Sequence, residues 1–171
     1  MKSLCLFCSF CISLTVFGQT PHLQGTINLD IPKGLISCEL KFSNTASNGS
    51  YTILLNSGFN LKYFKKGNNL LDNTTKDNSG KKEYELYSSA EDTVALKSVE
   101  GVSIFYTGAF PTYTKDSVTS DDMGVIAIKN NILRATVQSV FIPELVDRIS
   151  KKHITSYTYD FVVNCSRTET I

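Results

Sequence analysis

The sequence predicts an all-β domain, built as an antiparallel two-layer sandwich or a saddle-like sheet with at most one short helix. Short segments of alternating apolar and polar residues recur along the chain, and turn-forming residues separate them at intervals of about 8–12 residues. Eight Tyr and ten Phe are present, and aromatic and β-branched residues favour strands. The length of 171 residues with 42% hydrophobic content is enough for one domain with its own core.

Residues 1–18 are predicted to be a signal peptide, which leaves residues 19–171 as a single β-domain. Lys2 supplies a basic start, residues 4–17 form an apolar run, and cleavage is expected after Gly18. The run is shorter than the roughly 20 apolar residues that span a bilayer, so no integral membrane segment is expected in the mature chain. We therefore predict export to the periplasm, the cell surface or the medium.

The clearest predicted hairpin covers residues 26–42. Apolar and polar residues alternate in its two arms, 26–31 and 36–42, and Pro32-Lys33-Gly34 supplies the turn between them. Residues 44–50 follow as a loop.

Three further strands are expected in the next part of the chain, at residues 51–56, 59–64 and 83–87. Residues 65–82 between the last two are rich in Asn, Gly, Lys and Asp, and they are predicted to form a mobile surface loop. Residues 93–99 either add a strand or bridge to the next segment.

The domain is expected to be organised around residues 102–147. A strand at 102–106 ends before Gly108 and Pro111. Apolar runs on either side of Asn130-Asn131 predict a hairpin, because Asn tolerates the left-handed backbone of a tight turn.

The predicted short helix is a single turn at residues 143–149. Pro143 suits the first helical position, Glu144 suits the positive helix end, and Leu145 and Ile149 are spaced i, i+4.

Residues 156–165 are expected to form the last strand, with four apolar side chains on one face: Tyr157, Tyr159, Phe161 and Val163. An uncovered apolar edge strand recruits partners. We therefore expect self-association through this strand, or contact with another domain.

No group of residues meets the requirements of a catalytic, cofactor-binding or metal site, and no cofactor is predicted. His22 and His153 are far apart in sequence and lack a third ligand. Asp121-Asp122 lacks the spacing of a calcium loop and is expected to be solvated. The formal net charge of +1 gives no field that would favour nucleic acid.

Two cysteines remain outside the leader, Cys38 and Cys165. They can pair if their Cα atoms approach within about 7 Å, but the position of Cys38 inside a strand favours a buried unpaired side chain. Asn48, Asn73 and Asn164 stand in Asn-x-Ser/Thr sequons, which matter if the secreting cell glycosylates asparagine.

Three features occur in order along the chain: a strand ending in aromatic-x-Gly (residues 106–108), an apolar hairpin, and aromatic-x-Pro-x-x-x-Asp (residues 141–147). This pattern resembles the N-terminal non-catalytic β-domain of aminopeptidase-N-like (gluzincin) zinc metallopeptidases, over residues 23–171. The family's zinc motif H-E-x-x-H and its Gly-x-Met-Glu-Asn loop are absent, so the resemblance implies a domain and not an enzyme. It also implies a chain truncated before the catalytic domain. In the family a Gln near Gln138 helps to bind the substrate amine, but a structural strand Gln is the favoured interpretation here.

Two functions stay open. The first is an exported scaffold that shapes a peptide cleft and docks a catalytic peptidase domain. The second is a free-standing secreted β-sandwich that acts as a binding or adhesion module for a protein or a glycan. A capped, closed sandwich with an aromatic-lined concave face would favour the second.

Overall fold

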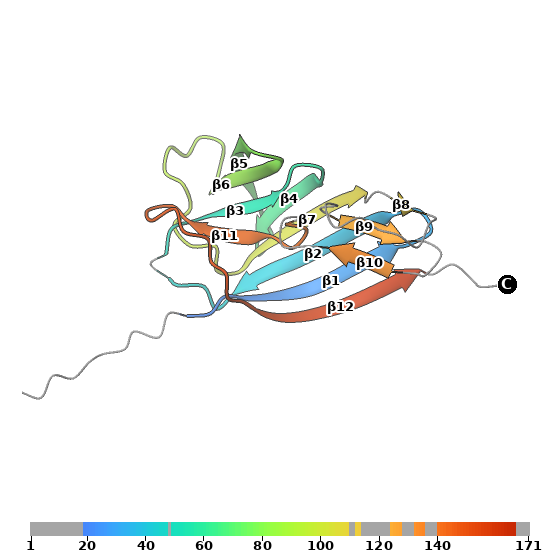
Figure 1. The fold of residues 1–171 in the computed structure, drawn as a ribbon. Coiled ribbons are helices and arrows are strands. Elements are labelled where there is room, and N and C mark those ends of the chain that lie inside the picture. The colour runs from blue at the N-terminus through green and yellow to red at the C-terminus, as the bar shows by residue number, and fades with distance from the viewer. Residues whose placement is uncertain are drawn as a thin grey trace, which may run out of the picture.

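The structure is a computed structural model that describes residues 19–47, 49–109, 112–113, 124–127, 132–135 and 140–166. Every regular element within these residues is a β-strand (Figure 1). The strands are β1 (His22–Asp30), β2 (Leu35–Ser43), β3 (Tyr51–Asn56), β4 (Asn60–Lys66), β5 (Asn69–Asn78), β6 (Lys81–Tyr87), β7 (Val102–Ala109), β8 (Thr112–Tyr113), β9 (Gly124–Ala127), β10 (Ile132–Ala135), β11 (Glu144–Asp147) and β12 (Thr158–Ser166). The predicted all-β class is confirmed.

Nine strands form one sheet in the order β11-β3-β6-β5-β4-β7-β2-β1-β12, and β8, β9 and β10 form a separate small sheet. Neighbours in the large sheet run antiparallel with one exception. The last strand, β12, lies parallel to the first strand, β1, along its whole length. The sheet is therefore mixed, and the N-terminal and C-terminal strands lie side by side at one end of it.

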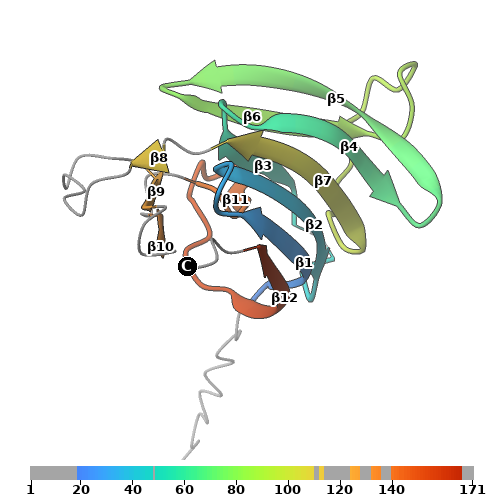
Figure 2. The ribbon, with the colours of Figure 1, turned by 90° about the vertical axis from the view of Figure 1, so that its right-hand side faces the viewer.

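The large sheet curls into two layers, as Figures 1 and 2 show. The bend lies in β5, whose first residues pair with β4 and whose remainder, from Asp72, pairs with β6. We call β4, β7, β2, β1 and β12 the five-stranded half, and β5, β6, β3 and β11 the four-stranded half. This arrangement matches the predicted two-layer sandwich.

The hydrophobic core fills the space between the two halves. Successive side chains of a strand point to opposite faces, so every second residue of β1, β2 and β7 enters the core. The five-stranded half contributes Leu23, Ile27, Ile36, Cys38, Leu40, Phe42, Phe64, Val102, Ile104 and Tyr106, and the four-stranded half contributes Ile53, Leu55, Tyr84, Leu86 and Leu145. The residues between these positions on β1, β2 and β7 are left on the outer face.

Both predicted hairpins are confirmed by the observed register. β1 pairs antiparallel with β2, with His22 opposite Ser43 at one end and Asp30 opposite Leu35 at the other. β9 pairs antiparallel with β10, with Ala127 opposite Ile132. The predicted leader, residues 1–18, lies outside the described residues.

The prediction of a mobile loop at residues 65–82 is wrong. The segment completes β4, forms all of β5 and begins β6. Residues 72–77 are exposed, yet they pair with β6, with Asp72 opposite Tyr87 at one end and Asp77 opposite Lys82 at the other. Because backbone hydrogen bonds hold this ladder without apolar side chains, the segment lacks the alternation that marks a strand in sequence.

The predicted helical turn at residues 143–149 is also wrong, because this segment contains β11. Leu145 packs in the main core, while its neighbour Val146 packs on the opposite face in a second cluster with Leu54 and Val140. Two adjacent buried residues on opposite faces require a strand. Ile149, the expected i+4 partner of Leu145, is 86% exposed.

Residues 93–99 do not form a strand and bridge β6 to β7, with Leu96 N–H bonded to Leu86 C=O at 2.7 Å. None of the elements in the described part of the chain is a helix that could cross a membrane.

Candidate functional site

The residues singled out in the sequence do not converge on one site. His22 Nδ1 lies 2.8 Å from Thr158 Oγ1, and His153 Nδ1 lies 3.3 Å from Glu144 Oε2. Within the described ranges no group of three His, Cys, Asp or Glu side chains could hold a metal ion. Asp121, Asp122 and Gln138 lie outside the described residues.

The cysteine and sequon positions are also separate. Cys38 is buried on β2 and Cys165 is exposed on β12, and both are free thiols. Burial raises the pKa of the Cys38 thiol to about 11, although a hydrogen bond with Tyr106 acts in the opposite direction. Asn73 is exposed on β5 and Asn164 on β12, while Asn48 lies outside the described residues.

The strongest candidate site is a row of polar side chains on the outer face of the five-stranded half. Cross-strand pairing aligns one polar residue from each of β4, β7, β2, β1 and β12 in a single row. In this strand order the residues are Asn60, Thr107, Ser37, Asn28 and Asn164. We call these five residues the polar row. Adjacent strands are about 4.8 Å apart, so the row extends for roughly 19 Å across the sheet.

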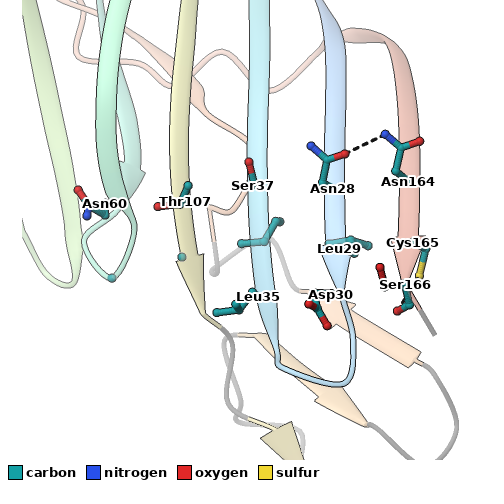
Figure 3. Close-up of a pocket in the computed structure, with 13 residues that line it drawn as sticks. Asn28, Leu29, Asp30, Leu35, Ser37, Asn60, Thr107, Asn164, Cys165 and Ser166 are labelled. Atoms are coloured by element: carbon teal, nitrogen blue, oxygen red, sulfur yellow. Dashed lines mark hydrogen bonds between the residues drawn. The ribbon is translucent and has the colours of Figure 1, made fainter. Parts of the chain in front are cut away.

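A groove of about 610 Å³ lies along the polar row (Figure 3). All five residues of the row line it, together with residues at the ends of β1, β2, β7 and β12. At the C-terminal end of β1 the groove reaches Asp30, which pairs with Lys33 at 3.0 Å, and the 44% exposed Leu35. The volume lies within the range of small-molecule sites, about 300–1,000 Å³.

One hydrogen bond fixes part of the polar row. Asn164 Nδ2 donates to Asn28 Oδ1 at 2.8 Å, as the dashed line in Figure 3 marks. An amide offers two donor hydrogens and two acceptor lone pairs, so each of these side chains keeps further capacity for a ligand. The bond therefore orients both amides and leaves them able to bind.

An aromatic pair lies in the next row of the same face. Tyr63 and Phe105 are cross-strand partners on β4 and β7, both half-buried, with ring centroids 5.4 Å apart. Glu39 lies opposite Phe105 on β2. The outer face therefore carries hydrogen-bonding groups in one row and aromatic surface in the adjacent row.

The Glu39 carboxylate is held by two donors. Lys65 Nζ lies 2.9 Å and the Tyr63 hydroxyl 2.7 Å from Glu39 Oε1. The hydrogen bonds from Lys65 and Tyr63 lower the pKa of Glu39, so the carboxylate stays ionised and compensated by Lys65. This network orients the Tyr63 ring next to the polar row.

A second groove, of about 430 Å³, lies on the outer face of the four-stranded half. Its carboxylates are already engaged: Glu85 pairs with Arg148, and Glu83 Oε1 accepts a hydrogen bond from Thr52 Oγ1 at 2.6 Å. We consider it the weaker candidate because both of its carboxylates are already paired within the protein.

Sequence reasoning missed the polar row. Asn28 and Ser37 were recognisable as the polar face of the hairpin at residues 26–42. Asn60, Thr107 and Asn164 come from distant strands, and only the register of the folded sheet places them in the same row. No local motif signals such a row.

Neither a protein-family model nor a curated protein sequence matches the chain. Solved structures similar to it include a non-cellulosomal cohesin from Archaeoglobus fulgidus, with a TM-score of 0.36 and 11% identity over 86% of this chain and 91% of that chain. A type I cohesin from Pseudobacteroides cellulosolvens gives a TM-score of 0.29 and 13% identity over 88% of this chain and 96% of that chain. A cohesin solved in complex with a dockerin, from Clostridium thermocellum, gives a TM-score of 0.31 and 12% identity over 86% of this chain and 97% of that chain.

The expected resemblance to an aminopeptidase N-terminal domain is wrong, since the similar solved structures named above are cohesin domains. The pattern at residues 141–147 that suggested it has a local structural explanation. Phe141 C=O accepts a 2.5 Å hydrogen bond from the Tyr106 hydroxyl, and Pro143 directly precedes the short edge strand β11.

Proposed function

We propose that the chain is a non-catalytic binding module that holds an extended, uncharged carbohydrate chain against the outer face of its five-stranded half. The observation that carries this proposal is the polar row, in which five strands each present one neutral amide or hydroxyl side chain to the same groove.

The chemistry of the row fits sugar hydroxyls. Asn, Ser and Thr side chains both donate and accept hydrogen bonds, as a hydroxyl does. None of the five carries a formal charge, so the row gains nothing from an ionic ligand. A row of roughly 19 Å is long enough to contact several sugar rings in succession.

The aromatic pair supports the same class of ligand. Tyr63 and Phe105 are half-buried and lie one row away from the polar row on the same face. Ligand sites combine apolar and aromatic surface with a few well-placed polar groups, and the apolar faces of sugar rings suit such a surface. Export through the predicted leader would bring this face into contact with extracellular or cell-surface glycans.

A protein partner is the second candidate, and it would use the outer face of the four-stranded half. Ile149 is 86% exposed there, and it lines the second groove together with Arg148 and Lys151. Protein interfaces combine an apolar centre with a polar rim, and Ile149 with its charged neighbours Arg148 and Lys151 would supply both.

The test is binding of the purified protein to a panel of neutral polysaccharides, measured by retention in affinity gels and by calorimetry. Thr107→Val keeps the side-chain shape and removes the hydroxyl at the centre of the polar row. It should weaken binding about fivefold, since one hydrogen bond contributes about 1 kcal/mol.

Thr74→Val is the matched control, because Thr74 is exposed on β5 and lines the second groove. It should leave carbohydrate binding unchanged. The proposal fails if no neutral polysaccharide is retained, or if Thr74→Val weakens binding as much as Thr107→Val does.

A further inference from the structure

We propose that β12 is a dimerisation edge, at which β12 of a second copy of this chain pairs antiparallel with Val162 on the two-fold axis. This inference concerns the edge of the five-stranded half and does not depend on what its outer face binds.

The two edge strands of the large sheet, β11 and β12, differ in whether their outer edges are covered. The outer edge of β11 is covered by the chain that follows it: Asp147 N–H bonds to Lys152 C=O at 2.9 Å, and Ile154 N–H bonds to Leu145 C=O at 2.9 Å. Among the described residues no strand pairs with the outer edge of β12. The strand runs for nine residues without Pro or Lys, which are the residues that commonly protect an exposed edge.

Two hydrogen bonds between β12 and the residues that flank β1 show which way the backbone N–H and C=O groups of β12 point. Thr158 N–H donates to Pro21 C=O at 3.0 Å, and Ser166 C=O accepts from Ile31 N–H at 3.2 Å. Backbone groups alternate in direction along a strand, so the even-numbered residues of β12 face β1. The N–H and C=O groups of the odd-numbered residues, among them Phe161 and Val163, therefore face the open edge.

This alternation permits an antiparallel partner centred on Val162. All nine residues of β12 then pair, because Val162 is the middle residue of Thr158–Ser166. The outward-facing residues meet as hydrogen-bonded pairs, Phe161 with Val163 and Tyr159 with Cys165 of the second copy, and each such pair exchanges two backbone bonds.

The side chains are also complementary in this register. An aromatic residue opposite a β-branched one, as with Phe161 and Val163, is a favourable cross-strand pair. Asp160 is the only charged residue of β12, and it falls opposite the neutral Asn164. Centring the pair on Asp160 instead would set two carboxylates against each other. Self-complementarity of one surface is what a two-fold dimer requires.

Apolar exposure supplies the driving force. Tyr159, Val162 and Val163 are 55%, 61% and 55% exposed, so both faces of β12 present apolar surface beside the open edge. Pairing would cover part of this surface and would join the five-stranded halves of two copies into one continuous sheet.

The test measures the oligomeric state by sedimentation velocity up to a few hundred micromolar, since edge pairing alone gives a small and weak interface. The wild-type protein should show a concentration-dependent dimer. Val162→Lys and Val162→Glu should each be monomeric, because each places two like charges on the two-fold axis. An equimolar mixture of the two variants should dimerise again, since Lys then faces Glu.

Val94→Lys is the matched control, because Val94 is 70% exposed in the segment between β6 and β7, and it should dimerise as the wild type does. Val163→Pro is a second variant, which removes an outward-facing N–H while leaving the bonds to β1, and it should also be monomeric. A wild-type protein that stays monomeric, or a Val162→Lys variant that dimerises as well as the wild type, would overturn the proposal.

Discussion

The hydroxyl of Tyr157 accepts a hydrogen bond from the backbone N–H of Leu145 at 2.6 Å. Leu145 lies in β11 and Tyr157 directly precedes β12, and these two strands are the opposite ends of the nine-stranded order. The bond therefore joins the two ends of the curled sheet. Burial raises the pKa of Tyr157 well above its usual value, so the hydroxyl stays protonated in all ordinary buffers.

Tyr157→Phe should destabilise the protein by about 1–3 kcal/mol, because it leaves the N–H of the fully buried Leu145 without its acceptor. Tyr159→Phe is the control, since Tyr159 is 55% exposed and its loss of a hydroxyl should change the free energy of unfolding little. Urea denaturation of both variants makes the comparison. Equal stability of the two variants would mean that the Tyr157 bond contributes nothing.

Gly25→Ala should destabilise the fold more than any glycine substitution in an open turn. Gly25 has φ of +150°, and a Cβ built there would lie 2.1 Å from the backbone oxygen of Glu39. Gly67, at φ of +60°, has nothing within 4 Å of such a Cβ, so Gly67→Ala should cost only the backbone term of about 1–2 kcal/mol. Comparing the thermal unfolding of the two variants separates the cost of the steric clash from the cost of the backbone conformation. A Gly25→Ala melting temperature equal to that of Gly67→Ala would show that β1 and β2 adjust without cost.

Much of the fold was predictable because it rests on local alternation. The hairpin at residues 26–42 has apolar residues at every second position, and Ile36, Cys38, Leu40 and Phe42 all enter the core. Such a pattern specifies both the strand and the buried face. The first strand and the closing strand were located in the same way, apart from their exact bounds.

The errors arose where side-chain pattern and backbone pairing do not coincide. β5 is held by its ladder with β6 and carries polar exposed residues, so its composition resembles that of a loop. β11 has Leu145 and Val146 buried on opposite faces, so it shows no alternation. The parallel pairing of β12 with β1 joins segments at opposite ends of the sequence, and no local signal encodes it.

The candidate site was unpredictable for the same reason. Asn28 and Asn164 are hydrogen-bonded neighbours in the polar row, yet 136 positions separate them in sequence. Their proximity depends on the register between β1 and β12, which sequence alone does not specify.

The two described cysteines should differ sharply in reactivity. Cys38 is fully buried, and burial raises its pKa to about 11, so the reactive thiolate is scarce at neutral pH. Cys165 is exposed. Iodoacetamide at about pH 8 should modify Cys165 in the native protein and Cys38 only after unfolding, as peptide mass spectrometry would show. Modification of Cys38 at the rate of Cys165, or a disulfide between them, would contradict the structure.

Asp147 should make the protein more stable near neutral pH than in acid. Its Oδ1 accepts hydrogen bonds from Ser150 N–H at 2.6 Å, Ser150 Oγ at 2.8 Å and Ile149 N–H at 3.2 Å, in the turn that covers the edge of β11. These bonds, led by those from Ser150, lower the pKa of Asp147 below its usual value of 3.8.

Because the folded pKa lies below the unfolded one, the stabilisation is complete above about pH 4–5 and is lost as the pH falls through the folded pKa. Asp147→Asn should therefore melt at a lower temperature than the wild type at about pH 6–7, and the difference should disappear near pH 2. Asp72→Asn, at an exposed position on β5, is the control and should show a much smaller difference throughout. A gap between the wild type and Asp147→Asn that stays constant down to about pH 2 would show that the charge of Asp147 has no part in holding this turn.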